Sequence, residues 1–199
     1  LKIFFKSVFS KFIQKKITSF HVTSDEELLT VRNLNTGIDT VLLRNIYEPP
    51  RKMTLPLSRS MRGDYIVHMS RISREKKIEE VILAFLKENI DLRLLIAGSK
   101  TDDEVYFNEL IELVSSCSGN DKVSFTGEAV TGEEKFDILS KAFALVYFPL
   151  PENFGMVVAE ALCYGTPVIS GKTVPWSGLE ERGAGYYCSI DDFQKNLSV

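Results

Sequence analysis

The chain has few of the features that mark membrane-spanning, metal-binding or nucleic-acid-binding proteins. Its 199 residues contain no apolar run of the ~18 residues that a membrane-spanning helix requires. Its three cysteines show no CxxC or Cys/His spacing typical of a metal site, and their odd number, without a signal peptide, fits a reducing compartment. The net charge of −3 argues against a nucleic-acid-binding domain, because such domains are usually basic.

The composition is that of a soluble globular protein with a substantial core. Hydrophobic residues make up 44% of the chain and the mean hydropathy is close to zero, so the apolar residues suffice for a packed interior. The length fits one large domain, or one domain and a fraction of another. No internal repeat and no low-complexity segment is present. Since the sequence begins with Leu1 rather than Met and ends soon after a predicted strand, we expect it to be a piece of a longer protein.

From residue 64 onward, strand-length apolar runs alternate with helix-length segments. The predicted strands cover 65–69, 92–97, 122–125, 144–148 and 167–169. The predicted helices cover 76–89, 102–116, 133–142 and 155–164. This alternation, with near-continuously apolar strands, predicts an α/β fold, a Rossmann-like parallel sheet with helices on both faces. Ligands of such sheets bind at the carboxyl ends of the strands, so site residues are expected there.

The first 63 residues are organised differently. A short strand is predicted from residue 19, and Ser24 and Glu27 have the spacing of a capping box at a helix start. Residues 41–46 predict a second strand, and the Arg-, Ser- and Pro-rich residues 51–63 predict a linker.

Residues 1–20 predict a basic amphipathic helix, with Phe, Val and Ile side chains at helical spacing and five lysines elsewhere on the wheel. Its apolar face can pack against another part of the protein. Alternatively, a helix of this kind can lie on an anionic membrane surface. Packing is the preferred interpretation, and peripheral membrane contact remains open.

The most informative segment surrounds the predicted helix 155–164. The first turn of this helix carries no charge, and a helix N-terminus offers unpaired N–H groups that suit a phosphate. Glu160 in the helix and Glu152 in the preceding loop can accept hydrogen bonds from hydroxyls on either side. One anion-binding helix end flanked by two carboxylates suits a sugar nucleotide. The plainer alternative is one solvated glutamate on an ordinary helix and another in an ordinary loop.

The whole segment resembles a known motif. Glu152 and Glu160 stand eight residues apart with Phe-Gly between them, and Glu-Ala-Leu-x-x-Gly-Thr-Pro-Val follows, as in the donor-binding motif of retaining glycosyltransferases of group 1 (family 4). These enzymes have two Rossmann-like lobes, and the motif belongs to the C-terminal lobe. The resemblance implies that residues 1–50 are a remnant of the N-terminal lobe and 51–63 the linker. Residues 64–199 are then the C-terminal nucleotide-sugar-binding lobe, truncated before its terminal crossing helix.

The resemblance also extends to a pair of cations after the first strand of this lobe. Arg71 and Lys76 match residues that hold the donor diphosphate in the family. Negative charge gathers on the leaving phosphate as the glycosidic bond breaks, and fixed cations at that point stabilise the transition state. The pair can replace a divalent ion, so no metal and no cofactor is expected. Alone, the pair would more simply be a solvated basic turn. Relatives usually have Gly after the lysine, where this chain has Lys77.

The remaining site residues come from the same resemblance. It implies that Glu152, with Arg71 and Lys76, belongs to the catalytic group and meets the transferred sugar, while Glu160 binds the ribose hydroxyls. The backbone N–H groups implied to meet sugar and phosphate belong to Phe154, Gly155, Met156 and Val157. Gly127 matches, more weakly, a family position at the end of a strand, where the nucleobase lies against the backbone of the following loop.

Three further side chains invite functional interpretations that the sequence does not require. His21 and His68 are predicted to be ordinary strand histidines rather than catalytic groups, because the family's candidate histidine belongs to the lobe that this chain lacks. Trp176 can be a packed aromatic or an acceptor contact, and both interpretations remain open.

The implied reaction is transfer of a sugar from a nucleoside-diphosphate sugar to a hydroxyl acceptor, with retention of the anomeric configuration. The present chain by itself is expected to bind the nucleotide but not to catalyse the reaction. Pro-Trp-Ser-x-Leu at 175–179 favours cell-envelope polysaccharide or lipopolysaccharide synthesis, with a glycan or lipid-linked acceptor. A cytoplasmic location is expected, with peripheral contact to the inner face of the membrane through residues 1–20 still open. The alternatives are a non-catalytic nucleotide-sugar-binding lobe that acts with a partner chain, or a nucleotide-sugar 2-epimerase. The sequence identifies neither sugar, base nor acceptor.

Overall fold

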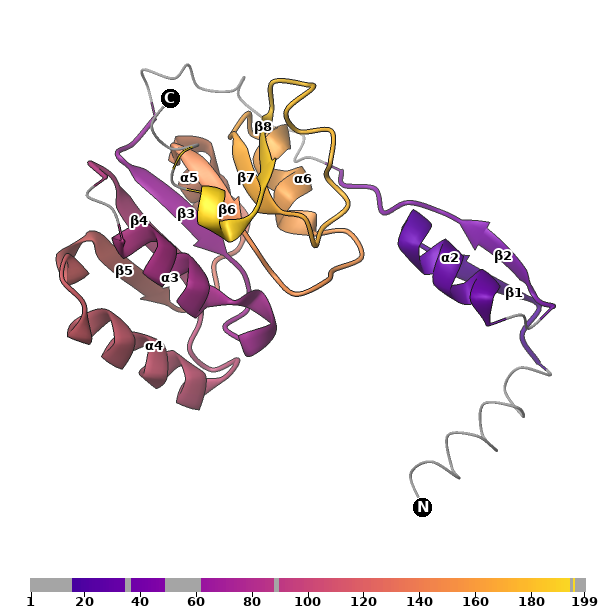
Figure 1. Cartoon of the computed structure of the whole chain (residues 1–199), viewed down its shortest axis with the longest axis horizontal. Helices are drawn as coiled ribbons and strands as arrows, with labels where there is room; N and C mark the ends of the chain where they lie inside the picture. Colours follow the sequence, from indigo (N-terminus) through magenta and orange to yellow (C-terminus); the bar gives the residue numbers. More distant parts are fainter. Residues whose placement is uncertain (1–15, 35–36, 49–61, 88–89, 194, 196–199) are drawn as a thin grey trace. The chain divides into compact units, whose positions relative to one another are not determined.

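A computed structural model describes residues 16–34, 37–48, 62–87, 90–193 and 195 (Figure 1). The chain divides into two compact units, Leu1–Ile46 and Tyr47–Val199, which are treated separately. Most of the predicted amphipathic helix (1–15) and most of the predicted linker (51–61) lie outside the described residues, so these predictions stay predictions. No helix within the described ranges is long and apolar enough to cross a membrane.

The described part of the first unit contains two parallel strands and one helix, β1 (Ser19–Val22), α2 (Asp25–Asn33) and β2 (Asp39–Leu42). The predicted capping interaction is present: the Ser24 hydroxyl accepts a hydrogen bond from the Glu27 N–H at 3.1 Å. The Glu27 carboxylate in turn accepts a hydrogen bond from the Thr23 N–H at 2.7 Å. This hydrogen bond holds the pKa of Glu27 below its usual value.

The second strand of this unit was predicted wrongly at 41–46, because β2 begins at Asp39 and ends at Leu42. Its end is explained by its neighbour. β1 ends at Val22, which pairs with Leu42, and the Leu43 N–H donates the last hydrogen bond to the Val22 carbonyl at 2.9 Å. Beyond that point β1 offers β2 no further partner.

The second unit is built on a six-stranded parallel sheet in the order β5-β4-β3-β6-β7-β8. Its strands are β3 (Tyr65–Met69), β4 (Arg93–Ser99), β5 (Val123–Gly127), β6 (Ala144–Tyr147), β7 (Val168–Gly171) and β8 (Gly185–Cys188). Its helices are α3 (Ile78–Leu86), α4 (Glu104–Ser116), α5 (Gly132–Lys141) and α6 (Met156–Cys163), with 3-10 turns η2 (Arg74–Lys76), η3 (Asn120–Lys122) and η4 (Ile190–Asp192). The predicted α/β architecture is therefore confirmed.

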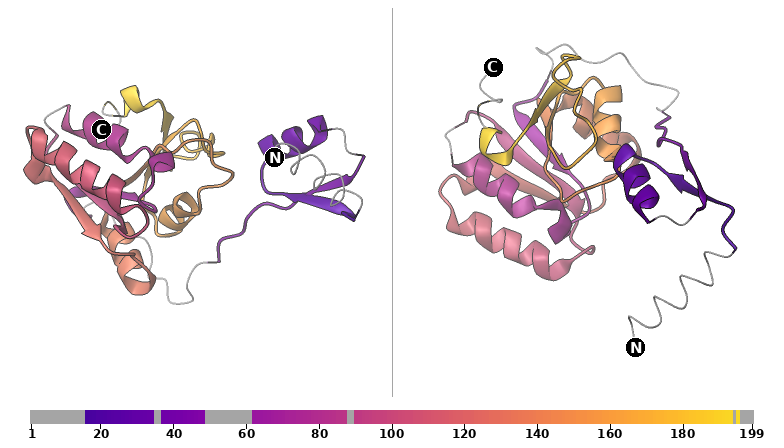
Figure 2. Two further views of the ribbon diagram at one scale, coloured as in Figure 1. Left: turned by 90° about the horizontal axis from the view of Figure 1, so that it is seen from below. Right: turned by 45° about the vertical axis from the view of Figure 1, so that its right-hand side comes forward.

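The core lies on both faces of this sheet. Helices α3 and α4 cover one face and α5 and α6 the other, as Figures 1 and 2 show. Successive side chains of β3 point to opposite faces of the sheet. Ile66 packs on the face covered by α3 and α4, and Val67 and Met69 pack on the face covered by α5 and α6. Burying each such side chain stabilises the fold by about 1.5–3 kcal/mol, which fixes the strand ends that carry the site.

Strand β8 was not predicted from the sequence. It is short, pairs only with β7 among the described strands, and begins at Gly185, which has a φ of +146°. A Cβ at this residue would lie 1.8 Å from the Val168 carbonyl oxygen, so the close approach of β8 to β7 requires glycine. Glycine at a strand start gives no apolar periodicity, which is why the strand was missed.

The predicted helix 76–89 was also wrong in its first part. Arg74–Lys76 form a 3-10 turn and α3 begins only at Ile78, because Lys77 between them has φ 51° and ψ 44°. Lys77 has the only positive φ among the non-glycine residues that the structure describes. Relatives usually have glycine at this point, and the backbone shows why: the left-handed conformation costs an L-residue about 1–2 kcal/mol.

Replacing Lys77 by glycine should therefore stabilise the protein. The relieved strain exceeds the extra unfolded-state entropy of glycine, and the net gain should be about 0.5–1 kcal/mol in the free energy of unfolding. Urea denaturation measures it. Lys87→Gly is the matched control, because Lys87 caps the end of α3 with an ordinary φ of −64° and should lose stability. Equal losses in both variants would contradict the strain assignment.

Candidate functional site

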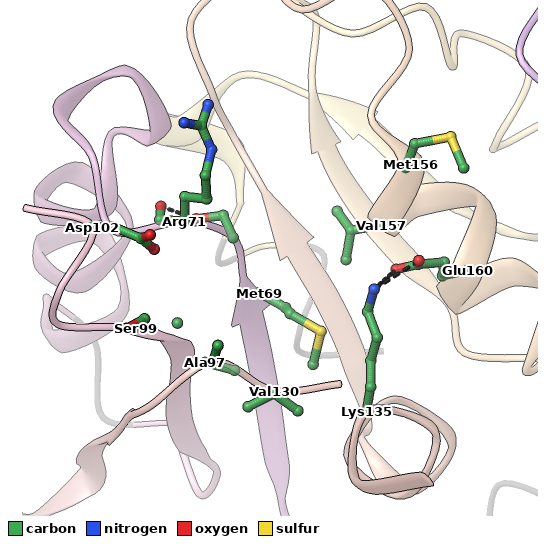
Figure 3. Close-up of a pocket in the computed structure, with 13 residues that line it drawn as sticks. Met69, Arg71, Ala97, Ser99, Asp102, Val130, Lys135, Met156, Val157 and Glu160 are labelled. Carbon is green, nitrogen blue, oxygen red and sulfur yellow. Dashed lines mark hydrogen bonds and ion pairs between the residues drawn. The ribbon is translucent and has the colours of Figure 1, made fainter. Parts of the chain in front are cut away.

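A cavity of about 300 Å³ lies at the carboxyl ends of β3 and β4, beside the start of α6. Figure 3 shows Arg71 and Asp102 on one side of it and Met156, Val157 and Glu160 on the other. Met69, Ala97 and Val130 lie between the two sides. The cavity stands where a parallel sheet places its ligands.

The structure brings part of the predicted site into this cavity. Arg71, Met156, Val157 and Glu160 line it. Glu152 and Lys76 do not line it but form an ion pair with each other. Phe154 and Gly155 belong to the loop before α6, and Gly127 ends β5 outside the cavity lining. The residues just after it, Ala129 and Val130, supply the lining instead.

Arg71 follows directly on the end of β3, in a loop held close to the neighbouring strand. A Cβ at Gly98 of β4 would lie 2.3 Å from the Ser70 carbonyl oxygen, so the loop after β3 approaches β4 closely only because residue 98 is glycine. Asp102 ties the loops together by accepting a hydrogen bond from the Ile72 N–H at 3.2 Å. Within the described part of the chain, the Arg71 guanidinium makes no hydrogen bond or ion pair and is available to an anion.

Glu160 is paired with a cation that the sequence analysis missed. Lys135 reaches from α5, and its ammonium lies 2.7 Å from each of the two Glu160 carboxylate oxygens. No sequence pattern predicts this ion pair, because the two residues belong to different helices and are 25 residues apart. Only the folded sheet brings α5 beside α6.

A second cluster joins Lys76, Glu152 and Tyr147. The Lys76 ammonium lies 2.8 Å from a Glu152 oxygen and 3.1 Å from the Tyr147 hydroxyl, and that hydroxyl donates a hydrogen bond to Glu152. Tyr147 is buried at the end of β6, where burial and the Glu152 carboxylate raise its pKa well above the usual value. It therefore stays a neutral donor. The sequence indicated only an apolar strand residue at this point.

The loop that carries Glu152 and Phe154 is held by the loop after β7. The Trp176 indole N–H donates to the Phe154 carbonyl, and the two rings lie 5.2 Å apart. The Glu152 N–H donates to the Thr173 carbonyl at 3.0 Å. Of the two interpretations of Trp176, these contacts match the packed aromatic. Gly155 then opens α6 with a φ of +75°, where a Cβ would crowd the Tyr147 ring at 3.3 Å.

The two histidines occupy ordinary surroundings. His21 bonds to the Leu43 carbonyl oxygen at 2.9 Å in the first unit. His68 is fully buried in β3 and bonds to the Ser70 hydroxyl at 3.0 Å; burial lowers its pKa to about 4. His68 is therefore neutral near pH 7. Among the residues described, no group of three or more His, Cys, Asp or Glu side chains is arranged to hold a metal ion.

The buried His68 generates a pH dependence of stability. Its folded pKa of about 4 lies below its usual 6.5, so the unfolded chain binds the proton first as the pH falls. Its contribution is complete above about pH 6.5 and should decrease by up to about 3 kcal/mol as the pH falls to 4.

Denaturation curves between pH 4 and 7 measure this effect. His68→Gln should flatten the dependence relative to wild type. An unchanged slope in His68→Gln would show that His68 takes up its proton equally in the folded and unfolded states.

The chain is similar to known proteins in sequence and in fold. The family model "Glycosyl transferases group 1" matches residues 57–185, more than half of the chain. The chain is similar to N-acetyl-alpha-D-glucosaminyl L-malate synthase of Bacillus anthracis, with 26% identity over 130 residues, covering 64% of this chain and 32% of that protein. It is also similar to alpha-monoglucosyldiacylglycerol synthase of Streptococcus pneumoniae, with 34% identity over 108 residues, covering 53% of this chain and 23% of that protein.

The chain thus spans about a quarter to a third of the length of these curated relatives. Among solved structures it is similar to Anabaena HepE in complex with UDP-glucose, with a TM-score of 0.69 and 15% identity, covering 91% of this chain and 53% of that one. At this identity the likeness shows the fold.

Proposed function

The chain belongs to the glycosyl transferases group 1 family, and we propose that it is the donor-binding lobe of an enzyme that transfers a sugar from a nucleoside-diphosphate sugar to a hydroxyl. One observation carries this proposal: a single cavity joins an unpaired arginine, a helix N-terminus and a carboxylate at the carboxyl ends of a parallel sheet. These are the groups that a diphosphate and a ribose need, side by side.

The diphosphate is assigned to the space between Arg71 and the start of α6. Arg71 offers a two-pronged charged donor on one side. Met156 and Val157, the first residues of α6, line the cavity from the other side, and a helix start offers unpaired N–H groups to an anion. Fixed donors of this kind stabilise the charge that develops on a departing phosphate, which is the group that leaves in sugar transfer.

The transferred sugar is assigned to the neighbourhood of Glu152. In the donor, the sugar and the adjacent phosphate share one bridging oxygen, so the groups that contact them must also be neighbours. The Lys76 ammonium and the Glu152 carboxylate are neighbours at 2.8 Å, and Tyr147 bonds to both. Lys76 would meet the phosphate, Glu152 the sugar hydroxyls, and the backbone of Phe154 and Gly155 the same sugar.

The acceptor and the stereochemistry are part of the proposal. We propose that the sugar is transferred with retention of its anomeric configuration, to a hydroxyl of a glycan or a lipid-linked acceptor. We assign this reaction to the synthesis of cell-envelope polysaccharide or lipopolysaccharide. The names of the two curated relatives contain a diacylglycerol and an L-malate, both of which offer a hydroxyl. HepE, crystallised with UDP-glucose, supports a nucleoside-diphosphate sugar as the donor class.

Alanine substitutions at Arg71 and Glu160 test the nucleotide site. Each removes at least one charge-assisted hydrogen bond, worth about 1.5–3 kcal/mol, so each should weaken binding of a nucleoside diphosphate by roughly tenfold or more. Calorimetry with UDP, GDP and ADP measures the affinities, and thermal unfolding confirms that the variants fold.

Arg74→Ala is the matched control for the arginine. Arg74 lies three residues away, but it pairs with Glu109 at 2.6 Å on the exposed surface and does not line the cavity. It should bind nucleotide like the wild type. Equal affinity in wild type, Arg71→Ala and Glu160→Ala would refute the site.

A further inference from the structure

Tyr147 joins the two charged groups that the proposed function assigns to the sugar and to its phosphate. It is the last residue of β6 and is only 2% exposed. Its hydroxyl bonds to both Lys76 and Glu152, which stand 76 residues apart in the sequence. The proposed function gives this hydroxyl no task of its own.

The direction of each hydrogen bond in this cluster follows from the chemistry of the three groups. A lysine ammonium only donates, so the Tyr147 oxygen accepts from Lys76 at 3.1 Å. The single hydroxyl proton is then left for Glu152, whose carboxylate only accepts. Lys76 also donates to Glu152 directly, at 2.8 Å. The three side chains thus form a closed triangle of hydrogen bonds.

Both donors of this triangle bind the same carboxylate oxygen. Tyr147 and Lys76 each contact Oε2 of Glu152, and none of the described residues bonds to Oε1. The Glu152 side chain is 29% exposed, so part of it is accessible from solvent. Oε1 is therefore the oxygen that remains for a ligand, and as an acceptor it requires a donor such as a hydroxyl.

The Tyr147 ring is held in place independently of its hydroxyl. It packs in the apolar cluster on the face covered by α5 and α6, with the His68 ring 5.9 Å away. On another side it lies against Gly155, where a Cβ would be 3.3 Å from the ring. The hydroxyl is thus a fixed point, whereas the longer side chains of Lys76 and Glu152 have more rotatable bonds to restrain.

We propose that Tyr147 is a positioning residue for the transferred sugar: its hydroxyl fixes Oε2 of Glu152 and so leaves Oε1 directed to a sugar hydroxyl. This inference rests on the proposed function, since it assumes that Glu152 contacts the sugar of a bound donor. Without the hydroxyl, Glu152 would keep Lys76 as its partner. That ammonium stands on a flexible four-carbon chain and would not hold the carboxylate in one orientation.

A purely structural role of Tyr147 has a different consequence. If the hydroxyl only satisfies its own hydrogen bonds in the interior, its loss lowers stability and weakens all ligands alike. The informative quantity is the affinity for a nucleoside-diphosphate sugar divided by that for the free nucleoside diphosphate, here called the sugar ratio. Only a change that reaches the sugar through Glu152 disappears when Glu152 itself is removed.

The test measures the sugar ratio by calorimetry, with whichever of UDP, GDP and ADP the wild type binds. The sugar conjugates are those of glucose, galactose, mannose and N-acetylglucosamine, and the one that binds most tightly is used. Glu152→Ala should lower the ratio by roughly tenfold or more, through loss of one charge-assisted hydrogen bond. Tyr147→Phe, which keeps the ring, should lower it by about threefold or more. In the Glu152→Ala background, Tyr147→Phe should have no further effect on the ratio.

Tyr106→Phe is the matched control. Tyr106 is also 2% exposed and its hydroxyl also donates to a glutamate, Glu79, but neither residue lines the cavity. Each variant loses a buried hydroxyl, so both should lose stability in thermal unfolding, while Tyr106→Phe keeps the wild-type sugar ratio. If Tyr147→Phe is too unstable for direct titration, a saturating nucleoside diphosphate stabilises its folded form. Displacement of that nucleotide by the sugar conjugate then gives the same ratio.

The possible failures have different scope. An unchanged sugar ratio in Tyr147→Phe, with a lowered ratio in Glu152→Ala, overturns the role of Tyr147 while the proposed function stands. An equal fall on Tyr147→Phe in the wild-type and Glu152→Ala backgrounds does the same. An unchanged ratio in Glu152→Ala overturns the sugar assignment of Glu152 and this inference with it. A wild type that binds no nucleotide overturns the proposed function itself.

Discussion

The common direction of the strands is the constraint on which the rest of this structure depends. Because β3, β4, β6 and β7 run parallel, the loops after them emerge at one edge of the sheet. Arg71 follows β3, Asp102 follows β4 and Glu152 follows β6, although 81 residues separate the first from the last. The buried side chains on both faces hold these strand ends in register.

Two carboxylates at this edge are neutralised by lysines, whereas Asp102 makes no ion pair among the described residues. Glu160 is held by Lys135, and Glu152 is held by Lys76, each across two different elements. Arg71 has no such partner among the described residues. We propose that a ligand with hydroxyls and a diphosphate binds at the arginine and exchanges hydrogen bonds with the paired groups, whose ion pairs orient them. Orientation in advance lowers the entropy that binding must overcome.

The sequence predicted the features that depend on local pattern. The apolar runs predicted the parallel sheet, with β3 at Tyr65–Met69 as observed. Of the two glutamates around Phe-Gly, Glu160 lines the cavity and Glu152 lies outside its lining. It could not predict features that depend on distant contacts. Lys135 and Tyr147 acquire their partners only through packing, and the break at Lys77 is a lysine where the backbone favours glycine. Strand β8 depends on a close approach to Val168 that no periodicity reveals.

The central claim is that cations of the chain itself hold the donor diphosphate. Calorimetric titration with UDP, GDP and ADP, first with a chelator and then with magnesium, tests it most directly. The account predicts that at least one of them binds in the presence of the chelator, with an affinity that magnesium leaves unchanged. Binding that appears only with magnesium would contradict the roles of Arg71 and Lys76, and no binding under either condition would contradict the nucleotide site.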